Sequence, residues 1–169
     1  MLVGVVSDSH DDIASTRRAA EFMRTSGVEA VIHLGDYIAP FTLRELARAV
    51  GVPIEGVIGN NDGEVSLLLR TASEVGARID PWPRVVQVGG RRMLLMHGNG
   101  PADVTVEVAH ALAESGRYDG VLYGHTHRAE LTYVRGVLVL NPGPLSSFVG
   151  GPSLALLKTE SMAARIVRL

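Results

Sequence analysis

Two histidines separated by a single residue, His125 and His127, follow the short apolar run 120–123. An apolar run of this length predicts a buried strand, so both imidazoles are expected where the chain leaves a sheet. Imidazole is the commonest nitrogen ligand for transition metals, and two imidazoles on one bend can reach a single ion. An isolated pair of this kind is more often an exposed turn. A metal site is therefore predicted only if other ligands converge on the same place.

Four other apolar runs end in residues whose side chains can bind metal ions. These are Asp8 and His10 after residues 2–7, Asp36 after residues 30–34, Asn60 after residues 54–58, and His97 after residues 91–96. The chain has no cysteine, so only nitrogen and oxygen atoms are available as ligands. With the two histidines above there are seven donors, which exceeds one tetrahedral site and suits two ions that share a ligand. A carboxylate can give one oxygen to each ion, and Asp36 is the central aspartate in chain order.

Some of these residues also have a purely structural interpretation. Asp11 and Asp12 precede a helix predicted over residues 13–25 and are suited to cap its N-terminus, although capping does not account for His10. Residues 59–63, with the sequence Gly-Asn-Asn-Asp-Gly, would form an ordinary turn if read alone. Only the order of all the motifs together favours the metal site.

Three further residues are expected to have structural roles. His33 lies inside a predicted strand, where a core residue or a hydrogen-bond partner of a ligand is expected rather than a ligand. His110 falls off the apolar stripe of the helix predicted over residues 103–115 and is expected to be solvated. Trp82, between two prolines, could line an active-site rim, but the expectation is that it packs a loop.

The N-terminal part of the chain alternates strands and helices. The strands are predicted over residues 2–7, 30–34 and 54–58, and the helices over residues 13–25, 40–50 and 64–71. Right-handed crossovers place these strands in one parallel sheet and gather their carboxyl ends at one edge. Asp8, Asp36 and Asn60 are thereby expected to lie together.

The rest of the chain is richer in hairpins. Strands are predicted over residues 85–88, 91–96, 120–123, 129–134, 137–140, 153–158 and 163–168, with one helix over residues 103–115. Glycines at positions 89, 90 and 136 are hairpin signals between consecutive strands. Hairpins predict a second, largely antiparallel sheet packed on the first. The whole chain is expected to be an α/β protein with a single domain, residues 1–169.

Composition excludes several classes of protein. Hydrophobic residues make up 46% of the chain and charged residues 20%, which excludes a disordered segment. The formal net charge of -2 gives no broad electrostatic reason to expect binding to nucleic acid or to a membrane surface. No apolar run is long enough for a membrane span, and residues 2–6 read as a strand rather than a signal peptide. The cytoplasm is the expected compartment.

The motifs D-S-H, G-D, G-N-N-D, H-G and G-H-T-H occur in this order over residues 8–127. This series resembles the calcineurin-like metallophosphoesterase superfamily, specifically its small bacterial and archaeal phosphodiesterase branch, and Asn141-Pro142-Gly143 is also similar to that branch. The resemblance implies a four-layer α-β-β-α sandwich with two mixed sheets. It also implies two metal sites, formed by Asp8, His10, Asp36 and His127 and by Asp36, Asn60, His97 and His125.

The sequence departs from the family pattern near the expected substrate. Many members have a histidine that helps the leaving group depart directly after the metal-binding asparagine, and this chain has Asn61 there. The third residue of the H-G motif is often histidine in relatives and is Asn99 here, and Pro144 stands where serine is common. These departures leave the acid catalyst and the substrate contacts open. The candidate substrate-facing residues are Asn61, Asn99 and Arg128.

The implied reaction is hydrolysis of a phosphodiester by a metal-bridging hydroxide that attacks phosphorus in line, with Asp36, Asn60 and His97 acting through the metals. Two divalent ions with two aspartates and one hydroxide leave a formal charge of about +1, which suits a diester monoanion. A histidine-rich site without thiolates favours manganese, with nickel, iron or zinc as alternatives, over magnesium.

Two other functions stay open at this point. One is a non-catalytic scaffold that binds proteins, because a trafficking-coat subunit resembles this branch and a fold does not guarantee catalysis. The other is a phosphomonoesterase, which the asparagine at position 61 disfavours. The expected partner is a small phosphodiester, whether nucleotide, cyclic nucleotide or lipid headgroup. Relatives are often dimeric or larger, so a homodimer or higher homo-oligomer is compatible with the resemblance.

Overall fold

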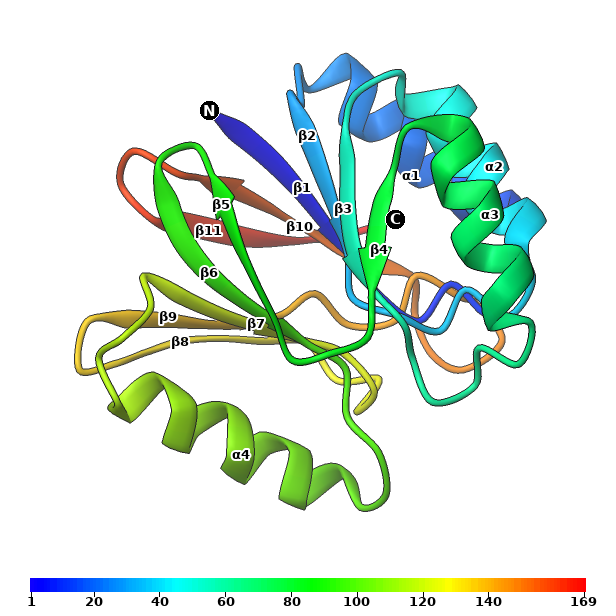
Figure 1. The fold of residues 1–169 in the computed structure, drawn as a ribbon. Helices are drawn as coiled ribbons and strands as arrows, with labels where there is room; N and C mark the ends of the chain where they lie inside the picture. Colours follow the sequence, from blue (N-terminus) through cyan, green and yellow to red (C-terminus); the bar gives the residue numbers. More distant parts are fainter.

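The computed structural model describes residues 1–169 and contains two β-sheets packed face to face, with helices on their outer sides (Figure 1). The N-terminal elements are β1 (Leu2–Val6), α1 (Ile13–Thr25), β2 (Ala30–His33), α2 (Pro40–Val50), β3 (Ile54–Val57), α3 (Val65–Val75) and β4 (Arg78–Asp80). They are followed by β5 (Arg84–Val88), β6 (Arg91–Met96), α4 (Ala102–Glu114), β7 (Gly120–Tyr123), β8 (Glu130–Val134), β9 (Val137–Asn141), β10 (Ser153–Lys158) and β11 (Ala163–Arg168). None of the helices combines the length and apolar character needed to cross a membrane.

Both sheets are mixed. The first has the strand order β11-β10-β1-β2-β3-β4, in which β1 to β4 are parallel and β10 and β11 pair antiparallel at one end. The second has the order β5-β6-β7-β9-β8, in which β6, β7 and β9 are parallel and the two edge strands are antiparallel. Helices α1 to α3 cover the outer face of the first sheet and α4 covers that of the second (Figure 1). The four-layer α-β-β-α sandwich with two mixed sheets is therefore confirmed.

The expectation of a largely antiparallel second sheet is wrong. Strands β6 and β7 are joined through α4, and a crossover helix of this kind brings the second strand back parallel to the first. The hairpin of β8 and β9 then places β9, not β8, beside β7, again in parallel. The last hairpin joins the other sheet, because β10 pairs with β1.

One helix end and one additional strand also differ from the sequence predictions. Helix α3 continues to Val75, beyond the expected residue 71, and ends where Gly76 adopts the left-handed conformation with φ of 72°. Strand β4 was not expected. It has only three residues and is ordered by its parallel pairing with β3.

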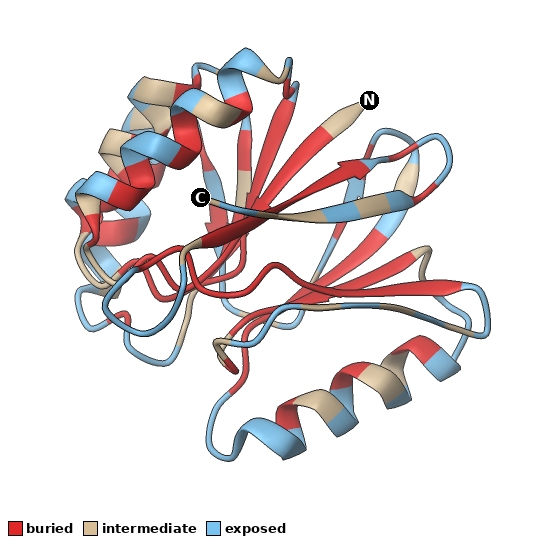
Figure 2. Ribbon diagram, turned by 180° about the vertical axis from the view of Figure 1, so that it is seen from behind, coloured by how far each residue is buried: buried red, intermediate tan, exposed pale blue.

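The core consists of three apolar layers, one at each junction of the sandwich. The first lies between the first sheet and α1 to α3, and includes Met23 and Leu43. The second lies between the two sheets, and includes Ile32 and Leu122. The third lies under α4, and includes Ala109. Figure 2 shows the buried residues concentrated on the strands and on the inner sides of the helices.

This packing fixes where the chemistry can take place. The parallel strands β1, β2 and β3 of one sheet and β6 and β7 of the other end at the same side of the molecule (Figure 1). The loops that follow them therefore converge, as is usual for ligand sites in α/β sheets. Every predicted metal ligand lies in one of these loops.

Candidate metal centre

Several residues in the loops that follow the parallel strands have an unusual backbone conformation. Positive φ is uncommon outside glycine, and where it persists it concentrates at functional sites. Five of the seven predicted ligands have positive φ, namely Asp8 (53°), His10 (42°), Asp36 (59°), His125 (71°) and His127 (53°). These five residues follow three strands, β1, β2 and β7, and their bends direct the side chains toward one place.

One group of four predicted ligands is close enough to hold a single ion. Asp8, His10, Asp36 and His127 each offer an atom, and these atoms all lie within 4.8 Å of one another. Nε2 of His127 is 3.3 Å from Oδ1 of Asp8, and Nε2 of His10 is 3.6 Å from Oδ2 of Asp36. Two carboxylates and two imidazoles suit a divalent transition metal.

The carboxylate of Asp8 provides an independent test of this fit. Oδ2 accepts a hydrogen bond from the backbone N–H of His125 at 3.1 Å, whereas Oδ1 is buried and has no hydrogen-bond partner. A buried carboxylate oxygen without a partner is costly, and a bound cation would remove that cost. The donor set of this chain therefore fits a metal ion at Oδ1 of Asp8.

The second group of predicted ligands converges on the amide oxygen of Asn60. This oxygen is 3.0 Å from Nε2 of His97 and 2.9 Å from Nδ1 of His125. The other nitrogen of His97, Nδ1, donates to the carbonyl oxygen of Leu34 at 2.5 Å. Because a carbonyl can only accept, Nδ1 of His97 must carry a proton, and the neutral ring then presents the lone pair of Nε2 to the site.

Asp36 lies between the two groups. Its Oδ2 faces His10, and its Oδ1 is 3.3 Å from Nε2 of His97. Asn61 orients this carboxylate: its backbone N–H donates to Oδ1 at 2.8 Å, and its side-chain amide donates to Oδ2 at 2.7 Å. One oxygen of Asp36 is therefore directed toward each group, as a shared ligand requires.

The electrostatics of the site follow from its burial. Burial alone would raise the pKa of Asp8, but the imidazoles of His127 and His97 outweigh it and hold the pKa below its usual range. The pKa of Asp36 is lowered against burial by His97 and Asn61. Burial would lower the pKa of His97, but Asp36 and Asp8 raise it. Protons and metal ions therefore compete for the same nitrogen atoms.

Asp62 is a residue of this site that the ligand prediction missed. It is buried, and its carboxylate accepts hydrogen bonds from the backbone N–H groups of Asp36 (3.1 Å), Gly59 (2.7 Å) and Ile38 (2.8 Å). It thus ties the loop after β2 to the loop after β3. The sequence signal was the aspartate that ends Gly-Asn-Asn-Asp, which reads as a turn residue until these partners are known.

Of the two aspartates expected to cap the first helix, only one does so. Asp12 is the N-cap of α1 and accepts from Ser15, as expected, whereas Asp11 accepts from Ala39 and Thr42 at the start of α2 instead. Asp8, three residues before Asp11, caps no helix.

The two histidines outside the predicted ligand set, His33 and His110, have different surroundings. His33 is a core histidine, as expected: it is fully buried, lies 3.0 Å from the hydroxyl of Ser9, and stacks on Tyr37 with the ring centroids 3.8 Å apart. His110 is partly solvated, as expected, and its Nε2 also lies 2.7 Å from a carboxylate oxygen of Glu130.

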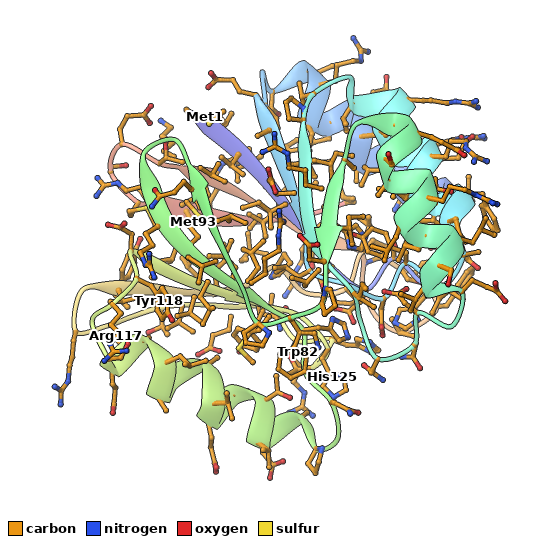
Figure 3. All side chains as sticks on the ribbon, in the orientation of Figure 1. Met1, Trp82, Met93, Arg117, Tyr118 and His125 are labelled. Atoms are coloured by element: carbon orange, nitrogen blue, oxygen red, sulfur yellow. The ribbon has the colours of Figure 1, made fainter.

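The candidate substrate-facing residues do not form one group. The amide of Asn61 is directed at Asp36, while Asn99 and Arg128 are exposed in the loops after β6 and β7. Arg128 makes no ion pair. Trp82 is half-buried and packs against the apolar layers on both faces of the second sheet, at the same end of the molecule as His125 (Figure 3). Trp82 thus packs a loop, as expected.

Comparison with known proteins agrees with this geometry. The sequence model of the calcineurin-like phosphoesterase superfamily domain matches residues 1–162 of this chain. Phosphodiesterase MJ0936 of Methanocaldococcus jannaschii is 32% identical to this chain, and the match covers 100% of this chain and 99% of the relative. Phosphodiesterase YfcE of Escherichia coli is 28% identical, and the match covers 86% of this chain and 79% of the relative. The solved structure of an archaeal phosphodiesterase has a TM-score of 0.87 at 33% identity with full coverage of both chains. Vps29 of Chaetomium thermophilum has a TM-score of 0.68 at 17% identity, covering 100% and 93%, and shares the fold. By sequence and by fold, the chain belongs to the calcineurin-like phosphoesterase superfamily.

Proposed function

We propose that this protein is a phosphodiesterase that depends on two divalent metal ions. The observation that carries the proposal is the position of Asp36, whose two oxygens are directed at two separate groups of nitrogen and oxygen donors. One ion would be held by Asp8, His10, Asp36 and His127, and the other by Asp36, Asn60, His97 and His125. When bound, the ions would act as Lewis acids toward the phosphoryl oxygens and lower the pKa of water to supply the nucleophile.

The protein's own residues hold this arrangement in place. Hydrogen bonds from Asn61 fix the plane of the Asp36 carboxylate, and the carbonyl of Leu34 fixes the ring of His97. The backbone N–H of His125 fixes one oxygen of Asp8. A site that is oriented before the substrate arrives needs no reorganisation as charge develops on phosphorus, which is the main source of electrostatic catalysis.

Two features favour a diester over a monoester. Two divalent ions with two aspartates and one hydroxide would leave a formal charge of about +1, which suits a diester monoanion better than a monoester dianion. The two relatives named above both carry the name phosphodiesterase. Manganese is the metal we propose, and nickel, iron and zinc are compatible with the same imidazole and carboxylate donors.

The test is hydrolysis of bis-p-nitrophenyl phosphate and of p-nitrophenyl phosphate by the purified protein. We expect turnover of the diester that EDTA abolishes and manganese restores, with the diester preferred. Asp36→Asn should remove this activity, whereas Asp80→Asn, which alters an exposed aspartate in β4, should retain it. Preference for the monoester would indicate a phosphomonoesterase. Absence of turnover of either compound would favour a non-catalytic scaffold.

A further inference from the structure

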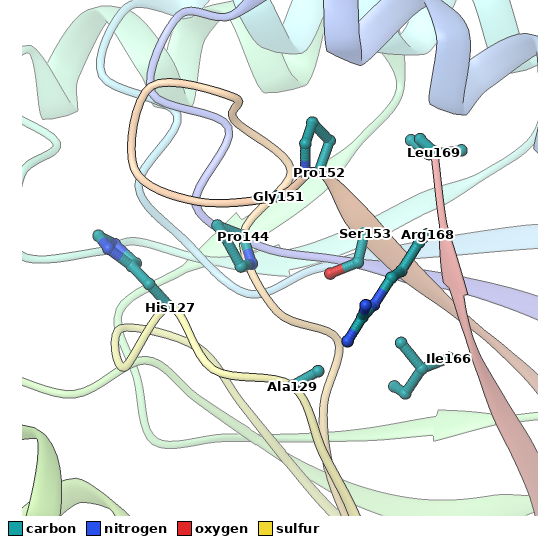
Figure 4. Close-up of a pocket in the computed structure, with 9 residues that line it drawn as sticks. All are labelled: His127, Ala129, Pro144, Gly151, Pro152, Ser153, Ile166, Arg168 and Leu169. Carbon is teal, nitrogen blue, oxygen red and sulfur yellow. The ribbon is translucent and has the colours of Figure 1, made fainter.

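A large cavity adjoins the metal centre. It has a volume of about 790 Å³ and lies where the start of β10 and the end of β11 face the loop before β8. His127 stands at one end of it, beyond Pro144, and Arg168 stands at the other (Figure 4). A volume of this size accommodates a group as large as a nucleotide. One of the predicted metal ligands is therefore also a wall of an open binding space.

The backbone of Arg168 is fixed at the far end of this cavity. Its backbone lies opposite Ser153 in the antiparallel pairing of β10 and β11, and the following residue, Leu169, donates a hydrogen bond to the carbonyl of Pro152 at 2.9 Å. Figure 4 shows the side chain between those of Ser153 and Ile166, with the guanidinium directed toward Ala129. The strand pairing thus aims the guanidinium into the cavity.

The charge of Arg168 is not offset by any partner. Arg168 makes no ion pair, and no aspartate or glutamate side chain lines the cavity. A smaller cavity of about 460 Å³ lies across the loop that carries His127, and there Arg128 is accompanied by Asp103, Glu107 and Glu130. Of the two cavities beside this loop, only the larger one is lined by an arginine without any acidic side chain.

We infer that this cavity binds one arm of the substrate, and that Arg168 binds a second anionic group, such as a phosphate, on that arm. The inference rests on the proposed function, because it places the scissile phosphate at the His127 end. A guanidinium presents a planar fork of N–H groups that matches phosphate oxygens, and a charge-assisted pair of this kind is stronger than a neutral hydrogen bond. The preferred substrate is therefore a phosphodiester with a further negative charge, rather than a neutral alkyl or aryl diester.

The experiment compares two substrates that share a leaving group. One is the p-nitrophenyl ester of thymidine 5′-phosphate, and the other is the same compound with an additional 3′-phosphate. We expect the KM of the wild-type protein to be about tenfold lower for the compound with the 3′-phosphate, which corresponds to one charge-assisted contact. Arg168→Ala should remove this difference, because the KM for the compound with the 3′-phosphate should rise about tenfold.

The controls separate this inference from the proposed function. Arg165→Ala removes another exposed arginine of β11 that does not line the cavity, and it should preserve the preference, while Arg168→Lys should restore part of it. If the KM of the wild-type protein is the same for both compounds, the inference is wrong. It is also wrong if Arg168→Ala raises the KM for both compounds equally. If neither compound is hydrolysed, the proposed function fails, and calorimetric binding of thymidine 3′,5′-bisphosphate against thymidine 5′-phosphate tests the role of Arg168 alone.

Discussion

Nε2 of His10 and Nε2 of His127 lie 3.2 Å apart, although 117 residues separate them in the chain. One histidine follows a strand of the first sheet and the other follows a strand of the second. The candidate metal centre is therefore built across the junction of the two sheets, and neither sheet carries a complete set of ligands. Residues that fix the relative position of these loops should matter as much as the ligands.

Asp62 is the clearest such residue, because it ties the loop of Asp36 to that of Gly59. In Asp62→Asn an amide N–H₂ replaces one acceptor, and at least one buried backbone N–H loses its partner. We expect the free energy of unfolding to fall by about 1–3 kcal/mol. Manganese affinity should fall about tenfold, because Asp36 loses its support. Chemical denaturation and calorimetric titration with manganese would measure both.

The matched control is Glu64→Gln, the same change of carboxylate to amide at an exposed residue two positions along the chain. It should leave the free energy of unfolding and the manganese affinity unchanged. Manganese affinity equal to that of the wild type in Asp62→Asn would show that Asp62 does not position Asp36.

Gly59 is required because another backbone approaches it closely. A Cβ atom at this position would lie 2.2 Å from the backbone nitrogen of Asp36 and would also overlap its carboxylate. Gly59→Ala must therefore displace Asp36, and we expect kcat/KM with manganese to fall at least about a hundredfold. In Gly63→Ala, in the same loop, a Cβ meets nothing within 4 Å, so kcat/KM should stay near the wild-type value. Equal activity of the two variants would contradict the geometry of this loop.

The sequence was sufficient for the parts of the site that depend on local pattern. Each predicted ligand follows an apolar run, and the parallel arrangement of β1, β2 and β3 follows from the alternation of strands and helices. These features could be predicted because a strand, its terminal loop and its crossover are all encoded within a few tens of residues.

The rest depends on pairings that are remote in sequence. The attachment of the last hairpin to the first sheet rests on the register of Gly4 with Leu156, and no local pattern specifies that choice. Asp11 could be recognised as a capping residue, but the helix that it contacts lies after the next strand. The role of Asp62 required knowledge of which backbone N–H groups surround it.

Asn61 should determine how the rate depends on the leaving group. Its amide donates to Asp36 and cannot supply a proton as an imidazolium can. We expect kcat/KM for a series of aryl and alkyl phosphodiesters to fall steeply as the leaving group becomes more basic. Asn61→His should flatten this dependence and increase turnover of alkyl esters most. A flat dependence in the wild-type protein would show that another group protonates the leaving oxygen.

Asp12 should make the fold sensitive to acid. Burial would raise its pKa, but hydrogen bonds from Ser147 and Ser15 lower it from 3.8 to about 2. Because the pKa is lower in the folded state, the stabilisation is complete above about pH 4 and is lost as the pH falls from 3.8 toward 2. A shift of this size corresponds to about 2 kcal/mol.

Asp12→Asn should therefore lower the free energy of unfolding by about 2 kcal/mol at pH 7, and the difference from the wild type should shrink below pH 4. Urea denaturation at several pH values would measure it. Glu21→Gln, at an exposed position on α1, should show no such difference. A difference for Asp12→Asn that does not depend on pH would mean that the charge of Asp12 is not what stabilises the start of the helix.

The most direct test of the two-metal centre is anomalous X-ray scattering from crystals of the protein grown with manganese. We predict two anomalous peaks per chain, one beside Asp8, His10 and His127 and one beside Asn60, His97 and His125, with one oxygen of Asp36 directed at each. A single peak, or peaks remote from Asp36, would contradict the account.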